Sequence, residues 1–268
     1  MSISIVFVTF LFQLAVGMTA TIVLLPPSVI DNRFFKSISF WAFLFAAIGI
    51  FVAAKTGLPL AGTKQYLLYG FTVLAFGHWL VLRFTERPAS RLTLALMAGI
   101  GIAALLLNLH YSPDGTRPTG WVRFLFPLHE LSGSLLLGGY LTGMMFGHHY
   151  LVNTEMPKRL LVTMADILML FLGIRALAVG ATLVGASHLQ PGLDLTASLL
   201  SLSGHGIFFW ERVLVGLFIP AIVAVMVWKT ARLGSNQSAT GIMYVAVAFV
   251  FMGELVARYL YLLSGIPL

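Results

Sequence analysis

The chain has 268 residues, of which 59% are hydrophobic and 9% are charged, and its formal net charge is +7. Soluble domains carry about 25% charged residues, so this composition excludes a soluble globular protein and indicates a polytopic membrane protein. Cysteine is absent, which excludes disulfides, thiolate zinc sites, cysteine-ligated iron–sulfur clusters and covalently attached c-type haem in this chain.

The first predicted element is an apolar helix over residues 3–25. The stretch before and within it lacks the basic n-region of a signal peptide, and its apolar run is too long for an h-region. We therefore expect it to be the first retained transmembrane span.

Seven further apolar runs follow in chain order, at 37–54, 65–84, 91–109, 124–151, 159–186, 206–229 and 240–263. At about 1.5 Å per residue, most of these runs can cross a hydrocarbon core of about 30 Å. They are long and show no strand alternation, so helices are expected. The sequence thus predicts an all-α integral membrane protein, a bundle of eight transmembrane helices in one domain over residues 1–268. No glycine fingerprint for a nucleotide is present.

The loops between these runs predict the orientation. Nine basic residues lie in the loops after the first, third, fifth and seventh runs: Arg33, Lys36, Arg83, Arg87, Arg91, Lys158, Arg159, Lys229 and Arg232. Four lie in the other loops: Lys55, Lys64, Arg117 and Arg123. The positive-inside rule then places both termini on the outer side of the membrane. We expect this membrane to be the inner (cytoplasmic) membrane of a bacterium or archaeon. Because the basic residues are spread over short loops, we expect a lipid bilayer and no nucleic acid as partner.

Several runs contain charged residues, which are costly in a bilayer and tend to face the bundle interior in pairs. They are Glu130, Asp166, Arg175, Glu211, Arg212, Glu254 and Arg258. Asp166 is expected near the inner face, and most of the others in the outer half of the last four spans. Glu254 and Arg258, four residues apart, are expected to pair along one helix face. Such a pair alone could be structural, but the whole group with His129 favours a site for proton or redox chemistry.

Histidines in facing spans suggest haem b as an alternative, because membrane cytochromes bind haem through axial histidines. The candidate ligands are His78, His110, His129, His148, His149 and His205. His129 and His148 would lie about 28 Å apart along one helix, near opposite faces. Lone histidines in helices are more often packing or capping residues, and no other metal site is predicted.

The fifth run is rich in glycine, with Gly133, Gly138, Gly139, Gly143 and Gly147. Small residues in a transmembrane helix let a neighbouring backbone approach closely, so this pattern predicts tight helix packing. Pro220 in the seventh run is expected to kink that helix.

Two stretches resemble a known family. The opening "FVTFLFQLAVGMTATIV" and the closing "GELVARYLYLLSG" are similar to the first and last spans of the membrane anchor subunits of dimethyl sulfoxide reductases and polysulfide reductases (the NrfD-like family). The resemblance implies an eight-span anchor with a quinone or quinol site near the outer face. It also implies iron–sulfur or cytochrome subunits on that face, which exchange electrons with the quinone.

A quinol loses two protons when it is oxidised, so an acid or a histidine must accept them. The expected quinone- and proton-handling residues are His129, Glu130, Arg175, Glu211, Arg212, Glu254 and Arg258. His129 or Glu130 suits the acceptor role, and the other carboxylates suit a proton exit path. The arginines would keep carboxylates ionised or hold a quinone carbonyl.

The sequence therefore predicts a quinone/quinol-reactive membrane subunit of a multi-subunit respiratory oxidoreductase, with quinone as substrate. Whether this chain is itself catalytic stays open. A haem b-binding membrane cytochrome is the first alternative. An ion- or proton-coupled transporter is the second, although the repeats and broken helices typical of transporters are not visible in the sequence. A purely structural assembly subunit is the third.

Overall fold

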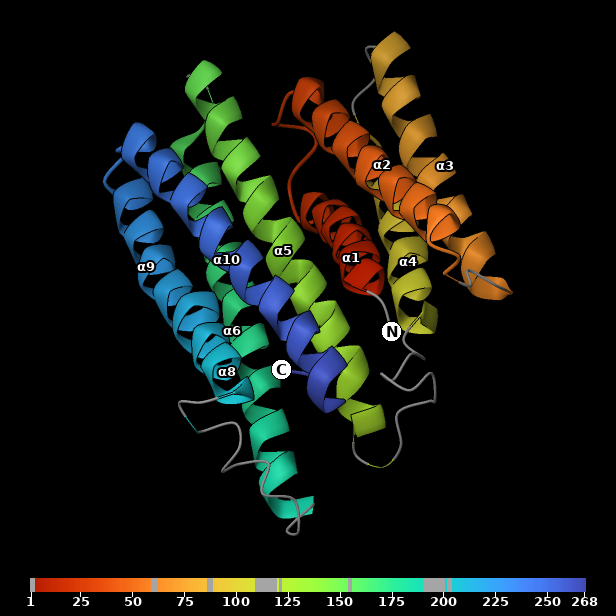
Figure 1. Cartoon of the computed structure of the whole chain (residues 1–268). Helices are drawn as coiled ribbons and strands as arrows, with labels where there is room; N and C mark the ends of the chain where they lie inside the picture. The colour runs from red at the N-terminus through yellow and green to blue at the C-terminus, as the bar shows by residue number, and fades with distance from the viewer. Residues whose placement is uncertain are drawn as a thin grey trace.

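The computed structural model describes residues 3–58, 62–85, 89–108, 120, 122–153, 156–189, 201 and 204–268. Every regular element in these residues is a helix: α1 (Ile3–Val23), α2 (Asn32–Lys55), α3 (Thr63–Phe84), α4 (Arg91–Asn108), α5 (Val122–Val152), α6 (Lys158–Leu189), α8 (His205–Val213), α9 (Ile219–Arg232) and α10 (Asn236–Ser264). A π-helical turn, η1 (Leu214–Phe218), joins α8 to α9. Successive segments run in alternating directions, and both chain ends lie in the lower half of the view (Figure 1).

Within the described ranges, six helical stretches are long and apolar enough to cross a membrane. They are Ile3–Val23, Asn32–Lys55, Gln65–Phe84, Lys158–Gly185, Gly206–Arg232 and Asn236–Ser264. Arg91–Leu107 is a shorter apolar helix, and α5 has 31 residues but carries several polar groups. The all-α membrane class is therefore confirmed, and the chain is a multi-pass membrane protein whose apolar helices contact lipid. The count of eight spans stays a prediction.

The described helices form two bundles of four segments each, in which α8, η1 and α9 together count as one segment. In the first bundle, α1 contacts α2 and α4, and α3 contacts α2 and α4. In the second bundle, α5 contacts α6 and α10, and α9 contacts the same two helices. The bundles meet mainly where α1 packs along α5, and α1 also touches α10. The seam between the two bundles is therefore lined by α1, α5 and α10 (Figure 1).

Glycine makes this seam possible. A Cβ on Gly138 of α5 would clash with the backbone of Gly17 and Met18 in α1, and one on Gly17 would clash with the carbonyl of Ser134. The hydroxyl of Ser134 donates to the carbonyl oxygen of Gln13 at 2.8 Å, which fixes the two helices in register. The predicted packing role of glycine in this helix is confirmed.

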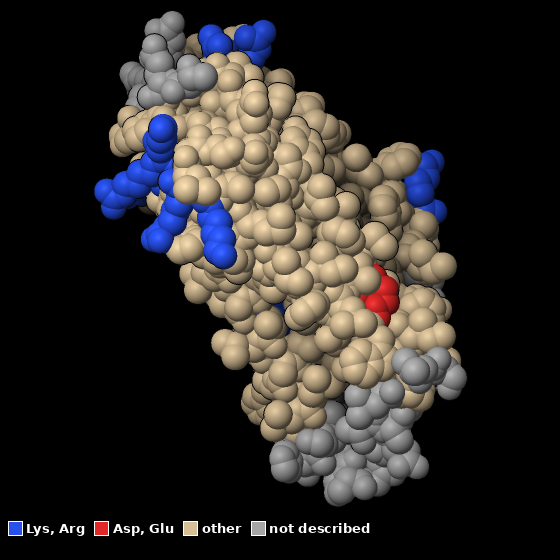
Figure 2. All heavy atoms as spheres, turned by 90° about the vertical axis from the view of Figure 1, so that its left-hand side faces the viewer, with Lys and Arg blue, Asp and Glu red and all other residues tan. Residues whose placement is uncertain are grey.

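Charged side chains gather at the ends of the molecule. In the described residues, one end carries Arg33, Lys36, Arg83, Arg91, Lys158, Arg159, Lys229 and Arg232, and the opposite end carries Lys55 and Arg123. We call the first the basic end. In Figure 2, Lys and Arg are concentrated toward the upper part of the face shown, and the middle of that face is largely uncharged. This pattern is typical of a protein whose middle lies in lipid.

Candidate functional site

Glu254 of α10 is the centre of the arginine cluster, which consists of Glu254, Arg175, Arg212 and Arg258. The Glu254 carboxylate is fully buried, and its Oε1 accepts from Arg175 Nε and Arg212 Nη2, both at 2.8 Å. Its Oε2 accepts from Arg175 Nη2 at 3.0 Å and from Arg258 Nη1 at 3.3 Å. Three guanidinium groups from α6, α8 and α10 thus share one carboxylate. The Arg175 pair is two-pronged, the strongest geometry for such an interaction.

Arg212 reaches Glu254 because α8 lies very close to α10. The backbones touch at Gly216 in η1 and Gly253, where a Cβ on Gly216 would stand 2.6 Å from Gly253 Cα. Pro220 has no N–H, so the carbonyl of Gly216 lacks its usual helical donor, and Arg212 Nη1 donates to it at 3.4 Å. Pro220 was expected to kink this helix, and the structure has a π-helical turn that ends at Phe218, two residues before Pro220. Such turns often occur at functional sites.

Arg175 connects this cluster to α5. Its Nη1 donates to the carbonyl of His129 at 3.0 Å and to Ser132 Oγ at 3.3 Å. Its Nη2 also donates to the main-chain oxygen of Leu268 at 3.0 Å. Gly133 of α5 leaves the room for this arrangement, because a Cβ there would stand 2.9 Å from Glu254 Oε2. One guanidinium therefore holds α5, α6, α10 and the segment after α10 together.

His129 is buried beside Arg175 with a defined tautomer. Its Nδ1 lies 2.9 Å from Arg175 Nη1 and must accept, because a guanidinium only donates. The proton of the neutral ring is then on Nε2, which donates to Thr182 Oγ1 at 2.7 Å and faces the Ala178 carbonyl at 3.1 Å. Both ring nitrogens are occupied, so ligation of haem iron by His129 would require one of these bonds to break.

Gln13, Glu130 and Arg258 form a second group, which we call the seam corner, where α1, α5 and α10 meet. Gln13 Nε2 donates to Glu130 Oε2, and Arg258 acts electrostatically on Glu130. The Arg258 guanidinium lies 5.6 Å from the ring centroid of Phe10, one turn before Gln13 on α1. Gln13 Oε1 and Arg258 Nε are buried and have no hydrogen-bond partner within the described part of the chain. The corner therefore offers one unused acceptor and one unused donor, which native structures rarely leave unpaired.

Gln13 was not among the residues expected from the sequence. The available signal was a lone amide side chain in the middle of an otherwise apolar span.

The charges of the arginine cluster and the seam corner together are unbalanced. Among the side chains, three arginines face two carboxylates, Glu254 and Glu130, which leaves an excess of one positive side-chain charge if both are ionised. Such a site favours an anion or a strong hydrogen-bond acceptor.

Two of the charged residues do not join the cluster. Glu211 is adjacent to Arg212 in sequence, but its two carboxylate oxygens are buried and have no hydrogen-bond partner in the described residues. Asp166 lies on an exposed face of α6, where it accepts from Trp228 Nε1 at 2.8 Å. Arg232 stacks on the same indole at 3.8 Å from the ring centroid.

The other candidate haem ligands are dispersed. His78 is buried and its Nδ1 lies 2.8 Å from Ser39 Oγ. His148 is exposed, and His149 packs against Phe34 with ring centroids 5.5 Å apart. His110 lies outside the described residues, and so does the side chain of His205. Over the described ranges, no group of three or more His, Cys, Asp or Glu could hold a metal ion. Haem binding stays a hypothesis.

Comparison with protein-family models and with curated proteins finds no match for this sequence. The class of the protein therefore rests on its fold, a multi-pass helical membrane protein. Its function has to be argued from the arginine cluster and the seam corner.

Proposed function

We propose that this protein is a quinone/quinol-reactive membrane subunit of a multi-subunit respiratory oxidoreductase. The observation that carries the proposal is the pair of unused hydrogen-bonding atoms at the seam corner, Arg258 Nε and Gln13 Oε1. A quinone carbonyl would accept from the arginine N–H, and a quinol hydroxyl would donate to the amide oxygen. The same two atoms therefore suit both redox forms of one ligand.

The family resemblance supports the same location. The first stretch that resembles the reductase anchors contains Gln13, and the second contains Glu254 and Arg258. These stretches lie at opposite ends of the chain, yet α1 and α10 contact each other beside the cluster. A shared binding site gives a functional reason for both stretches to carry their polar residues.

Oxidation of a quinol releases two protons and two electrons. Glu130 is the proposed first proton acceptor, because it is hydrogen-bonded to Gln13 and lies within the electrostatic influence of Arg258. Three arginines already bond to Glu254, which favours a holding role for this carboxylate over proton transfer. The positive excess would stabilise the negative charge that develops on the quinol oxygen as its proton leaves. The electrons would pass to iron–sulfur or cytochrome partner subunits.

The proposal includes eight spans with both termini outside, in the inner membrane of a bacterium or archaeon. The basic end would then be cytoplasmic. Arg258 lies six residues before the end of α10, which corresponds to about 9 Å from the opposite end. The corner would therefore be reached from the outer half of the membrane.

Binding of a quinone analogue tests the proposal directly. Fluorescence titration of purified protein with 2-heptyl-4-hydroxyquinoline N-oxide should show saturable binding, and lipid extraction should release quinone.

Gln13→Leu should weaken binding of the analogue about tenfold, which corresponds to one hydrogen bond of about 1.4 kcal/mol. Gln65→Leu is the matched control, because Gln65 lies in the first turn of α3, outside the seam, where its Nε2 donates to Tyr69 Oη. Absence of analogue binding, or wild-type binding by Gln13→Leu, would refute the proposal. A haem α-band in the reduced-minus-oxidised spectrum would favour the cytochrome alternative.

A further inference from the structure

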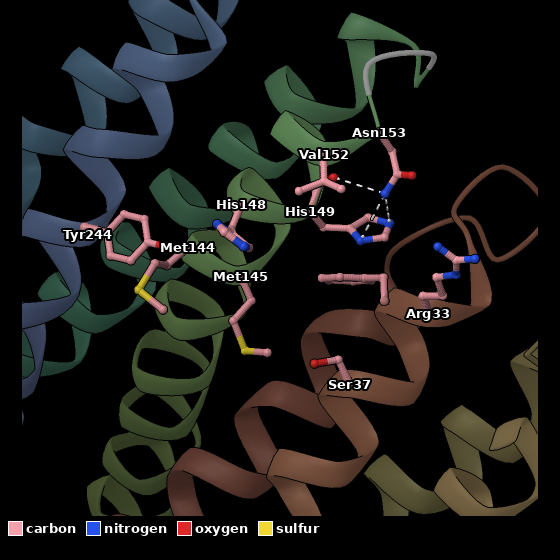
Figure 3. Close-up of a pocket in the computed structure, with 10 residues that line it drawn as sticks. Arg33, Ser37, Met144, Met145, His148, His149, Val152, Asn153 and Tyr244 are labelled. Atoms are coloured by element: carbon pink, nitrogen blue, oxygen red, sulfur yellow. Dashed lines mark hydrogen bonds between the residues drawn. The ribbon is translucent and has the colours of Figure 1, made fainter.

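A groove lies at the basic end of the molecule, far along α5 from the seam corner. Its volume is about 240 Å³, α5 forms its floor, and α2 and α10 flank it (Figure 3). Its polar side chains include Arg33, His149 and Asn153, and its apolar side chains include Met144, Met145 and Tyr244.

The polar and apolar residues occupy different depths. Asn153 directly follows the end of α5, and Arg33 is the second residue of α2, so both lie at the rim of the bundle. Met145 lies eight residues before Asn153, and Tyr244 lies eight residues after the start of α10, which places both about 12 Å deeper. The groove is therefore polar at the membrane boundary and apolar toward the hydrocarbon.

The groove opens to the surroundings of the bundle. Tyr244 is 47% exposed and Val152 is 71% exposed, and His148 is also exposed. In Figure 3, Met144 lies beside Tyr244, Met145 projects into the space between Tyr244 and α2, and His149 projects toward α2. A molecule in this groove would be reached from the lipid phase along α5.

The rim carries an exposed arginine, Arg33, which is only weakly paired. Within the described residues, the Arg33 guanidinium forms one ion pair, with Asp31 at 3.8 Å, and the two side chains are 80% and 41% exposed. Exposed pairs at such distances contribute little, so Arg33 can turn toward another anion. His148 and His149 add two hydrogen-bonding rings, and Tyr244 is the lining residue from α10. The rim therefore combines one cation with several donors.

We propose that the groove binds an anionic phospholipid. Its phosphate diester would interact with Arg33 and with the side chains of His149 and Asn153. An acyl chain would lie over Met145 and beside Tyr244, where flexible methionine side chains can adapt to it. Basic pockets between transmembrane helices on the cytoplasmic side are suited to anionic lipid headgroups. A free phosphate would leave the apolar half of the groove unfilled. A phospholipid fills both halves and is therefore the ligand that fits the groove.

Native mass spectrometry of delipidated, purified protein provides the test. Dioleoylphosphatidylglycerol should bind wild-type protein in preference to dioleoylphosphatidylcholine. Arg33→Gln should weaken that binding about fivefold, as expected for one basic residue near a lipid surface. Lys55→Gln is the matched control, because Lys55 is exposed in the last turn of the same helix at the opposite end. It should bind phosphatidylglycerol like the wild type.

A second variant addresses the apolar half. Met145→Trp adds bulk inside the groove without a change in charge, and it should reduce phosphatidylglycerol binding while leaving helix content unchanged. Equal binding of the two lipids by the wild type, or unchanged binding by both variants, would overturn the proposal. Thermal protection by inorganic phosphate equal to that by phosphatidylglycerol would also overturn it, because the site would then recognise the anion alone.

Discussion

Replacement of Glu254 by glutamine probes the arginine cluster most directly. Glutamine has nearly the same shape, so the change removes the negative charge and one of the two acceptor oxygens. Three guanidinium groups would then face a neutral amide. Its NH₂ group would direct N–H donors at the N–H donors of the arginines. In the described residues, no second Asp or Glu side chain pairs with Arg175 or Arg212, and the other bond of Arg175 Nη2 goes to the main-chain oxygen of Leu268.

The size of the effect follows from burial. The side chain of Glu254 is 0% exposed, Arg212 is 0% exposed and Arg175 is 4% exposed, so water cannot replace the lost interactions. Removing one partner of a buried ion pair costs about 3–5 kcal/mol, mainly because the remaining charge stays buried. With three arginines involved, we expect Glu254→Gln to lower the free energy of unfolding by at least about 3 kcal/mol. The double variant Glu254→Gln, Arg212→Gln should lose less unfolding free energy than the two single variants lose in sum, because both single variants remove the same interaction.

Unfolding in mixed micelles with increasing dodecyl sulfate, followed by circular dichroism, measures this difference. Glu211→Gln is the matched control, since Glu211 is a neighbouring buried carboxyl without a hydrogen-bond partner in the described residues. We expect that control to be neutral or stabilising, because an unpaired buried charge is costly. If the free energy of unfolding of Glu254→Gln is within about 0.5 kcal/mol of the wild-type value, the electrostatic account of the cluster is wrong. The same holds if Glu211→Gln is destabilised as much as Glu254→Gln.

Two further predictions concern the seam and the topology. Gly138→Leu should separate α1 from α5 and destabilise the protein by about 1–3 kcal/mol in the same unfolding assay. Gly77→Leu is the control and should have little effect, because there is open space around Gly77. Equal stability of the two variants would contradict the close packing of α1 on α5. Because the chain has no cysteine, Ser235→Cys and Thr56→Cys can be labelled singly in spheroplasts with an impermeant maleimide. Only Thr56→Cys should react, and reaction of both would refute the eight-span topology.

The helices and one ion pair could be predicted from the sequence for simple physical reasons. Long apolar runs have few alternatives to a helix in lipid, so the observed ends lie within a few residues of those predicted, apart from the earlier start of α2 at Asn32. The Glu254–Arg258 pair follows from helical periodicity and is confirmed at 3.3 Å. Both inferences need only local geometry.

The rest of the cluster depends on how distant helices pack. Arg175 is 79 residues from Glu254 and Arg212 is 42 residues away, so no spacing rule could join them. The separation of Glu211 from Arg212 has a local cause, since adjacent residues on a helix do not face each other. Glu211 and Arg212 were expected in one site because they lie at the same depth. Adjacent positions on a helix point about 100° apart, so the two side chains enter different surroundings. Partners such as Thr182 carry no signal in the sequence at all.

The contrast between the two groups of polar residues suggests how stability and function are divided. In the arginine cluster, one carboxylate accepts from guanidinium groups on three helices, which suits a rigid frame within the second bundle. In the described residues, Arg212 Nε is a buried donor without a partner in that frame, whereas the seam corner has both an unused acceptor, Gln13 Oε1, and an unused donor, Arg258 Nε. Ser134 holds the Gln13 backbone one turn from Glu130. Any shift of α1 along α5 would therefore change the geometry of the proposed quinone site before it disturbed the cluster. Gly138→Leu should accordingly lose analogue binding under conditions where the second bundle is still folded.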